Sequence, residues 1–242
     1  MTDTTRIWLC VLAVALPAQL PGQTPQEVRE QRIHNDWAYL ARYRQANAEL
    51  PAPAPGEQRV VFMGNSIMEA WAKFFPAHFP DKPYIGRGIS GQTTPQMLVR
   101  FRQDVLALRP DVVVLLAGTN DIAGNTGAST LEMIEDNIAS MVELAQANGI
   151  AVVLCSVLPV FDYPWKKGLE PAPRIVALNA WLKSYAARVG AVYVDLHTPL
   201  ADTRFGLRAE FSPDGVHPNE AGYRVMAPLV AQGIATALKR AR

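Results

Sequence analysis

Three residue types that together perform nucleophilic acyl transfer occur near the two ends of the chain. Ser66 follows the apolar run of residues 60–63 and Gly64, so a predicted strand ends on a glycine and is followed by a serine at a helix start. Such a turn exposes the hydroxyl beside unpaired backbone N–H groups. Asp214 lies three residues before His217. Together they would supply a nucleophile, a base and an acid that orients the base.

Each of these signals has a simpler explanation when it stands alone. Serine is an ordinary N-cap of helices, and Gly-x-Ser occurs by chance in many proteins. His217 directly precedes Pro218, where the last predicted helix begins, so the histidine could instead cap or pack at that helix start. The catalytic interpretation therefore depends on both signals occurring together.

Two segments between these ends could donate hydrogen bonds to a developing oxyanion. Gly91 lies between an apolar stretch and a helical pattern, so a tight turn there would expose its backbone N–H. Asn120 follows the apolar run of residues 112–117, which is typical of a buried strand, and its amide would lie at the same sheet edge. No phosphate-binding glycine motif or Walker lysine follows the first strand, which disfavours a nucleotide site.

Four sequence blocks, around Ser66, Gly91, Asn120 and the pair Asp214 and His217, occur in this order. Together they resemble the SGNH branch of the GDSL esterase/lipase family, from about residue 59 to residue 240. The resemblance implies that Ser66 is the nucleophile, His217 the general base and Asp214 its partner. It also implies an oxyanion hole formed by the backbone N–H groups of Ser66 and Gly91 and the side-chain amide of Asn120. The expected reaction is hydrolysis of a carboxylic ester through an acyl-enzyme, with no cofactor.

The first block departs from the family pattern, because Asn65 stands where the family usually has aspartate. Asparagine keeps a side-chain acceptor but loses the charge. Since Asp214 would orient the histidine, we expect activity to survive, with altered electrostatics and an altered pH profile near the nucleophile.

The expected substrates are short acyl esters, above all O-acetyl groups of carbohydrates. This preference depends on the predicted export, on the absence of a long apolar lid segment and on the family resemblance. Two alternatives stay open. One is lysophospholipid or thioester hydrolysis, and the other is a catalytically silent carbohydrate-binding relative, which Asn65 motivates.

The composition is that of one ordinary α/β domain. The chain has 242 residues, 49% of them hydrophobic, which is enough for a sizeable core. Its 23 basic and 22 acidic residues give a net charge of +1, and no basic run is interleaved with aromatics. Nucleic acid is therefore not an expected partner, whereas a neutral or modestly polar small-molecule or carbohydrate ester is compatible with this charge.

The N-terminal region divides into three predicted parts before the hydrolase domain at 59–242. Residues 1–22 resemble an export signal, since Arg6 precedes an apolar run too short for a stable membrane span, and a periplasmic or secreted protein is expected. The alternative is a disordered or membrane-associated tail. Residues 23–50 are predicted as an accessory helix, with helical periodicity over 25–48, and residues 51–58 as a Pro-rich linker.

Alternating apolar runs and helical patterns predict a three-layer α/β/α fold. Strands are expected near 59–64, 84–89, 111–117, 150–156 and 191–195, and they should form a five-stranded, doubly wound parallel sheet of flavodoxin-like type. Ser129 and Glu132 suggest a capping box, with Gly149 ending that helix and Gly190 ending the next. Ligands of such folds bind beyond the carboxyl ends of the strands, where Ser66, Gly91 and Asn120 all fall.

Several other residues have weaker claims to a functional role. Tyr163 and Trp165, after the fourth predicted strand, could line an acyl pocket or stack on a sugar, or simply pack within their own loop. Asp121 should position its loop, and Cys155 should be a core thiol. His197 follows a strand end and is expected to be structural. No cluster with metal-ligand spacing occurs, so no metal is predicted.

Overall fold

The computed structural model describes residues 24, 27, 30–31 and 34–240. Among the described residues, 38–240 form one compact unit and those before residue 38 belong to another, so residues 38–58 belong to the same unit as the predicted hydrolase domain. The predicted export signal at 1–22 lies outside the described residues. In the first unit, residues 27, 30–31 and 34–35 are helical, and the Thr24 hydroxyl caps them by accepting the Glu27 N–H.

The continuous helix predicted over residues 25–48 is wrong among the described residues. Residues 37–38 and 40–43 form turns, and only Arg44–Glu49 (α2) is helical beyond them. Tyr39 has a φ of 56°, in the left-handed region that interrupts a right-handed helix. The neighbouring carbonyl groups bond outside the segment, because Ala38 accepts from the Gln92 side chain and Leu40 from Gln103. Tertiary contacts thus override the local periodicity.

Five parallel strands form the sheet in the order β2-β1-β3-β4-β5. This order confirms the predicted flavodoxin-like topology. The observed strands lie within the predicted ranges: β1 Val60–Gly64, β2 Tyr84–Gly88, β3 Val112–Leu116, β4 Ala151–Cys155 and β5 Val192–Val194. β1 and β3 are buried throughout, as expected for strands covered on both faces.

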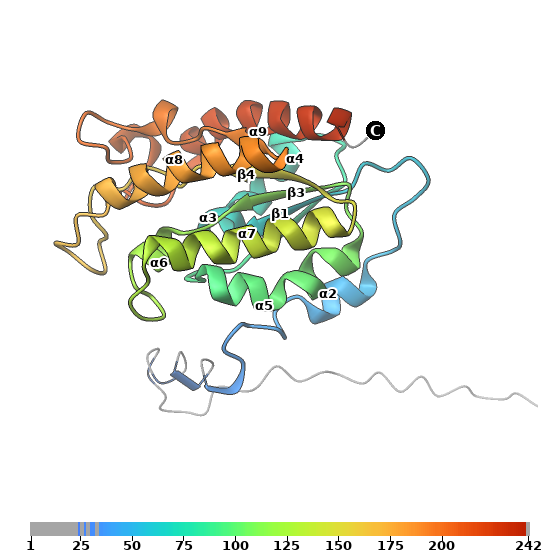
Figure 1. Cartoon of the computed structure of the whole chain (residues 1–242), viewed down its shortest axis with the longest axis horizontal. Helices are drawn as coiled ribbons and strands as arrows, with labels where there is room; N and C mark the ends of the chain where they lie inside the picture. Colours follow the sequence, from blue (N-terminus) through green and yellow to red (C-terminus); the bar gives the residue numbers. More distant parts are fainter. Residues whose placement is uncertain (1–23, 25–26, 28–29, 32–33, 241–242) are drawn as a thin grey trace, which may run out of the picture. The chain divides into compact units, whose positions relative to one another are not determined.

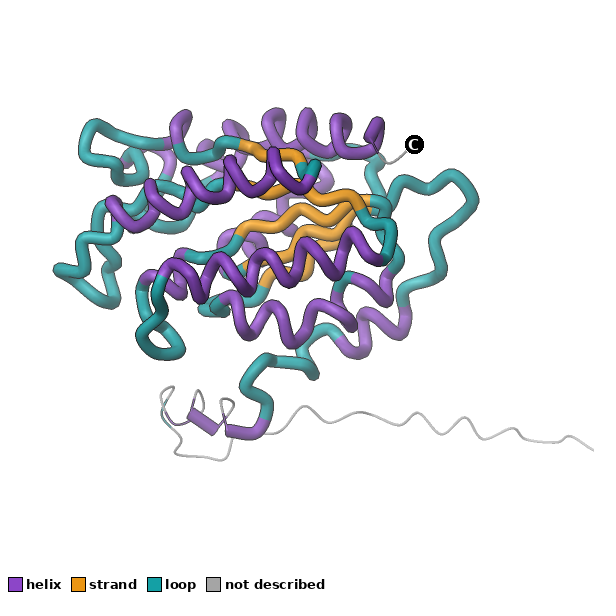
Figure 2. Tube along the Cα trace, in the orientation of Figure 1, coloured by secondary structure: helices purple, strands orange, loops and turns teal. Residues whose placement is uncertain are grey.

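Helices cover both faces of this sheet (Figures 1 and 2). One face carries α5 (Thr94–Asp104), α7 (Leu131–Ala147) and α8 (Ala172–Val189). The other carries α3 (Ser66–Trp71), α4 (Phe75–His78) and α9 (Glu220–Arg240). The short remaining elements are α6 Thr119–Ile122 and the 3-10 turns η1 Ala72–Phe74, η2 Leu106–Leu108, η3 Thr198–Leu200 and η4 Ala209–Phe211.

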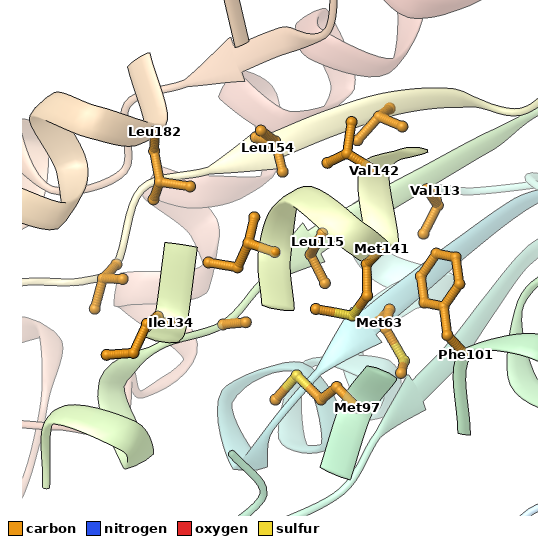
Figure 3. Close-up of a cluster of buried hydrophobic side chains, with 14 of the residues drawn as sticks. Met63, Met97, Phe101, Val113, Leu115, Ile134, Met141, Val142, Leu154 and Leu182 are labelled. Atoms are coloured by element: carbon orange, nitrogen blue, oxygen red, sulfur yellow. The ribbon is translucent and has the colours of Figure 1, made fainter. Parts of the chain in front are cut away.

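The two faces have separate apolar cores because side chains alternate along each strand. Val61 and Met63 of β1 point into the core under α5, α7 and α8, whereas Val60 and Phe62 point into the opposite core. Figure 3 shows the first core, where Met63 meets side chains of α5 and α7. β1 is thereby anchored on both faces directly before the turn that carries Ser66.

The predicted cap of α7 is displaced by one residue. Thr130, and not Ser129, is the N-cap, because its hydroxyl accepts the Met133 N–H three residues later. Ser129 lies one residue before this N-cap, and its main-chain carbonyl accepts from the Arg174 side chain of α8. The predicted end of α8 is confirmed, since Gly190 adopts a φ of 74° as the C-cap.

The topology brings three predicted site residues to one edge of the sheet. Ser66 follows β1, Gly91 follows β2 and Asn120 follows β3, and β1 lies between the other two strands. The loops after β3 and β4 emerge at this same edge, on the left in Figure 1. Within the described part of the chain, no helix has the length and apolar character needed to cross a bilayer.

Candidate active site

Ser66, His217 and Asp214 meet although 151 residues separate the serine from the histidine. Ser66 Oγ lies 2.9 Å from His217 Nε2, and His217 Nδ1 lies 2.7 Å from Asp214 Oδ2. An ionised carboxylate only accepts hydrogen bonds, so Nδ1 carries a proton and Nε2 is left to accept from the serine hydroxyl. This is the geometry in which a histidine can act as general base on a serine.

Asp214 is held in its ionised form by the loop that carries it. Burial raises the pKa of this carboxyl, but hydrogen bonds from the backbone and ring of His217 and from Val216 N outweigh it and lower the pKa to about 2. Oδ1 accepts from Val216 N at 2.9 Å and from His217 N at 2.8 Å. The short loop therefore fixes both the charge and the direction of the carboxylate.

Ser212 belongs to this loop and was not singled out from the sequence. Its hydroxyl is buried, accepts from Gly215 N at 3.0 Å and lies within hydrogen-bond distance of Asp214 Oδ1 (3.1 Å) and of the His217 carbonyl (2.8 Å). Ser-Pro-Asp-Gly is a turn sequence, which was the available signal for this side-chain-stabilised loop.

The three predicted oxyanion donors lie at neighbouring strand ends. Ser66 is the first residue of α3, so its N–H precedes the helical hydrogen-bond ladder. Gly91 has a φ of 78°, which favours glycine. The Asn120 amide donates one N–H to the Gln92 carbonyl at 2.9 Å, and Asn125 Nδ2 donates to its oxygen at 3.0 Å. These two hydrogen bonds fix the orientation of the Asn120 amide.

Asn65 retains the acceptor function predicted for it. It is fully buried and is the N-cap of α3, where Oδ1 accepts from Ile67 N at 3.0 Å. Its Nδ2 has no hydrogen-bond partner among the described residues. The asparagine therefore preserves the turn before Ser66 but leaves one buried donor unsatisfied.

Asp121 positions the loop that contains Asn120, as predicted. Its carboxylate accepts from Thr94 N at 2.9 Å and Thr94 Oγ1 at 2.6 Å. Burial raises the pKa of Asp121 to about 6, against the opposing effect of these hydrogen bonds. The residue therefore ties the start of α5 to α6, which follows β3.

The two aromatic candidates after β4 have different environments. Tyr163 is completely buried, and its hydroxyl donates to the Thr119 carbonyl at 2.8 Å, so its predicted role in substrate binding is wrong. Trp165 is 46% exposed, and its ring lies 6.2 Å from that of His217 at an angle of 37°. Its Nε1 donates to Asn125 Oδ1 at 3.2 Å. Trp165 therefore offers an open aromatic surface beside the histidine.

The remaining candidates lie in other surroundings. Cys155 is buried in the core, and burial raises the pKa of its thiol, so it lacks the thiolate character of a nucleophile. The backbone N–H of His197 donates to Ser156 Oγ and Asp195 Oδ1. Within the described ranges, no three His, Cys, Asp or Glu side chains are grouped as metal ligands.

Most of the chain is similar to known proteins. A model of the GDSL-like lipase/acylhydrolase family matches residues 62–225. An acetylxylan esterase from Xylanibacter ruminicola is 27% identical over 221 residues, which cover 76% of this chain and 45% of that protein. The chain spans about half the length of the curated relatives it matches.

Two solved structures match nearly throughout their own lengths. A Bacteroides fragilis protein is 48% identical with a TM-score of 0.82, covering 84% of this chain and 99% of that one. A GDSL-like lipase from Bacteroides thetaiotaomicron is 45% identical with a TM-score of 0.81, covering 84% of this chain and 100% of that one. These matches support the α/β fold described above.

Proposed function

The chain belongs to the GDSL-like lipase/acylhydrolase family, and we propose that it is a serine-dependent carboxylic ester hydrolase. The observation that carries this proposal is the chain of contacts from Ser66 Oγ to His217 Nε2 and from His217 Nδ1 to Asp214. It supplies a nucleophile, a base of fixed tautomer and an ionised partner in one line.

In the proposed reaction, Ser66 Oγ attacks the ester carbonyl carbon while His217 Nε2 takes the hydroxyl proton. The negative charge on the carbonyl oxygen is stabilised by the N–H groups of Ser66 and Gly91 and by the Asn120 amide. The tetrahedral intermediate collapses and expels the alcohol, which receives the proton from His217. Water then attacks the acyl-enzyme, with His217 again as base, and releases the acid and free Ser66.

We further propose short acyl groups on carbohydrates as substrates. Two observations support this class. The Xylanibacter ruminicola relative is an acetylxylan esterase. Trp165 places an exposed indole ring beside His217, and such a ring can stack on the apolar face of a sugar. Export to the periplasm or medium is proposed from residues 1–22, and N-terminal sequencing of protein recovered from outside the cytoplasm tests it.

The testing experiment compares wild type with Ser66→Ala on p-nitrophenyl esters of about two to twelve carbons and on acetylated xylooligosaccharides. We expect turnover that depends on Ser66 and falls steeply with acyl length. Turnover that rises with length, or that favours thioesters, would replace the carbohydrate assignment with lysophospholipid or thioester hydrolysis. A protein that binds glycans in both forms, without turnover and without phosphonate labelling of Ser66, would be a binding relative.

A further inference from the structure

Arg100 is a fully buried cation close to the turn that carries Ser66. It lies in α5, and its guanidinium makes three side-chain bonds with fixed partners. Nη1 pairs with Asp104 at 3.0 Å, Nη2 donates to the Gly64 carbonyl at 3.0 Å and Nε donates to Gln92 Oε1 at 2.5 Å. Desolvating a guanidinium is costly, so a partner for each of its three nitrogens indicates a fixed arrangement.

Two of the three acceptors of Arg100 belong to segments that carry oxyanion donors. Gly64 lies two residues before Ser66, and Gln92 directly follows Gly91. The main-chain carbonyl of Gln92 also accepts from the Asn120 amide at 2.9 Å. One residue, Gln92, therefore connects the buried arginine to the segments that carry Gly91 and Asn120.

The side-chain nitrogen of Gln92 is bonded to a segment outside the predicted hydrolase domain. Gln92 Nε2 donates to the Ala38 carbonyl at 2.8 Å, within the protein interior. Asn47 Nδ2 donates to Asp104 at 2.7 Å, and the Tyr43 hydroxyl donates to the Gly88 carbonyl. We call residues 38–47 the N-terminal strap. It is bonded near one end to the loop that carries Gly91 and near the other to the last residue of α5.

On these contacts, and resting on the proposed esterase function, we propose that Gln92 is a positioning residue for the oxyanion hole, clamped between Arg100 and the N-terminal strap. Neither Gln92 nor the strap needs to touch the substrate. Their effect is to hold Gly91 N and the Asn120 amide where charge develops in the transition state. The Ala38 carbonyl and the Asn47 side chain of the strap then support the geometry of the oxyanion hole without contacting the substrate.

The expected kinetic effect follows from how narrowly such donors must be placed. Removing one oxyanion donor costs on the order of 10²–10³ in kcat, so loosening two donors without removing them should cost roughly 10–100-fold. KM should change little, because the ground-state ester does not require the same donor geometry.

The decisive variants are Gln92→Met and Gln92→Glu, with Gln146→Met as the matched control. Methionine keeps the length of the side chain but removes both hydrogen bonds. Glutamate can still accept from Arg100 but cannot donate to the Ala38 carbonyl, so it separates the strap from the arginine. Gln146 also donates its amide to a main-chain carbonyl, that of Val189 at 2.8 Å, but at the opposite edge of the sheet.

We expect kcat for p-nitrophenyl acetate to fall roughly 10–100-fold in Gln92→Met and less in Gln92→Glu, with Gln146→Met at the wild-type value. Affinity for a trifluoromethyl ketone, which forms an oxyanion on Ser66, should fall in parallel with kcat/KM. The pH at which kcat/KM is half-maximal should stay constant, because the His217 and Asp214 contacts are intact.

Wild-type kcat in Gln92→Met, or an equal loss in Gln146→Met, would overturn the proposal. If Gln92→Met does not fold, Asn47→Ala provides a second test, because it loosens the strap from Asp104. A wild-type kcat in Asn47→Ala would also overturn the proposal. A wild-type protein without esterase activity would instead refute the proposed function, so the two failures are distinguishable.

Discussion

The carboxylate of Glu69, one turn after the candidate nucleophile, accepts the backbone N–H of Ser90 at 2.8 Å and also the Ser90 hydroxyl. Ser90 immediately precedes Gly91, so helix α3 is tied to the loop that carries an oxyanion donor. The approach is close enough to require glycine at position 88, where an added Cβ would lie 2.1 Å from Glu69 N. Nucleophile and donor loop are therefore fixed to each other directly.

Glu69→Ala should lower kcat/KM for p-nitrophenyl acetate by about tenfold, because the backbone N–H and the hydroxyl of Ser90 lose their acceptor while Gly91 N remains present. Steady-state kinetics provide the measurement. Arg42→Ala is the matched control, since Arg42 pairs with the same carboxylate at 3.2 Å from an exposed position. Exposed ion pairs contribute little, so that variant should stay near wild type. An equal loss in both variants would contradict a role for the Ser90 bond.

Asp214→Asn should lower kcat on the order of 10³–10⁴-fold, because a neutral amide no longer enforces the proton on His217 Nδ1. The wild-type carboxyl, with its pKa lowered to about 2, stays ionised throughout the working range. Its own protonation therefore cannot cause a loss of activity above about pH 4. A kcat–pH profile of both proteins checks this, and a variant that regains the wild-type rate at high pH would contradict it.

Stability should fall with rising pH through the titration of Asp121. Burial raises the folded-state pKa to about 6 from an ordinary value of 3.8, so the folded protein binds the proton more tightly than the unfolded chain does. The free energy of unfolding contributed by this group is then largest below the unfolded pKa and declines between about pH 4 and pH 6, by at most about 3 kcal/mol.

Asp121→Asn should remove this decline. Urea unfolding of both proteins across that pH range measures it, with the difference between the two curves as the readout. Parallel stability curves for wild type and Asp121→Asn would show that Asp121 does not titrate in this range.

Asn65→Asp should keep esterase activity and raise the melting temperature. The aspartate would still accept from Ile67 N, would add a negative charge at the start of α3 and would remove the buried Nδ2, which has no partner among the described residues. A charged cap is worth about 0.3–1 kcal/mol, offset in part by burial of the charge. Thermal unfolding and kinetics check both expectations, and a fall in kcat would show that the asparagine has a specific catalytic effect.

The fold was largely predictable because β1, β3 and β4 are apolar on both faces and helical patterns separate successive strands. The four blocks predicted which residues meet at the sheet edge, since parallel strands bring their carboxyl ends together. Local patterns failed where a distant partner decides the outcome. Tyr163 was expected at the site, but it is buried in the core, where its hydroxyl donates to the Thr119 carbonyl. The helix over 25–48 was expected from its periodicity. Two main-chain carbonyls of that segment instead accept hydrogen bonds from the side chains of Gln92 and Gln103.

The supporting residues could not be found from spacing alone. Ser212 had a turn sequence as a signal, but Asn125 and Arg100 had none. Asn125 bonds Asn120 and Trp165, and Arg100 bonds Gly64 and Gln92, so each acts through contacts that exist only after folding. A buried arginine can be recognised as unusual only once its burial is known.

Trp165→Ala should weaken binding of acetylated xylooligosaccharides more than that of p-nitrophenyl acetate. The indole is 46% exposed and lies beside His217, so a sugar carrying the ester can stack on it, whereas a small acetyl ester has no second ring that requires this surface. One aromatic stack is worth about 0.5–1.5 kcal/mol, which corresponds to a rise in KM of roughly 2–12-fold for the oligosaccharide. Trp181→Ala is the control, because Trp181 stacks on Tyr185 in α8 and belongs to no part of the site. Equal effects of Trp165→Ala on both substrates would indicate that the indole supports His217, and would count against the carbohydrate assignment.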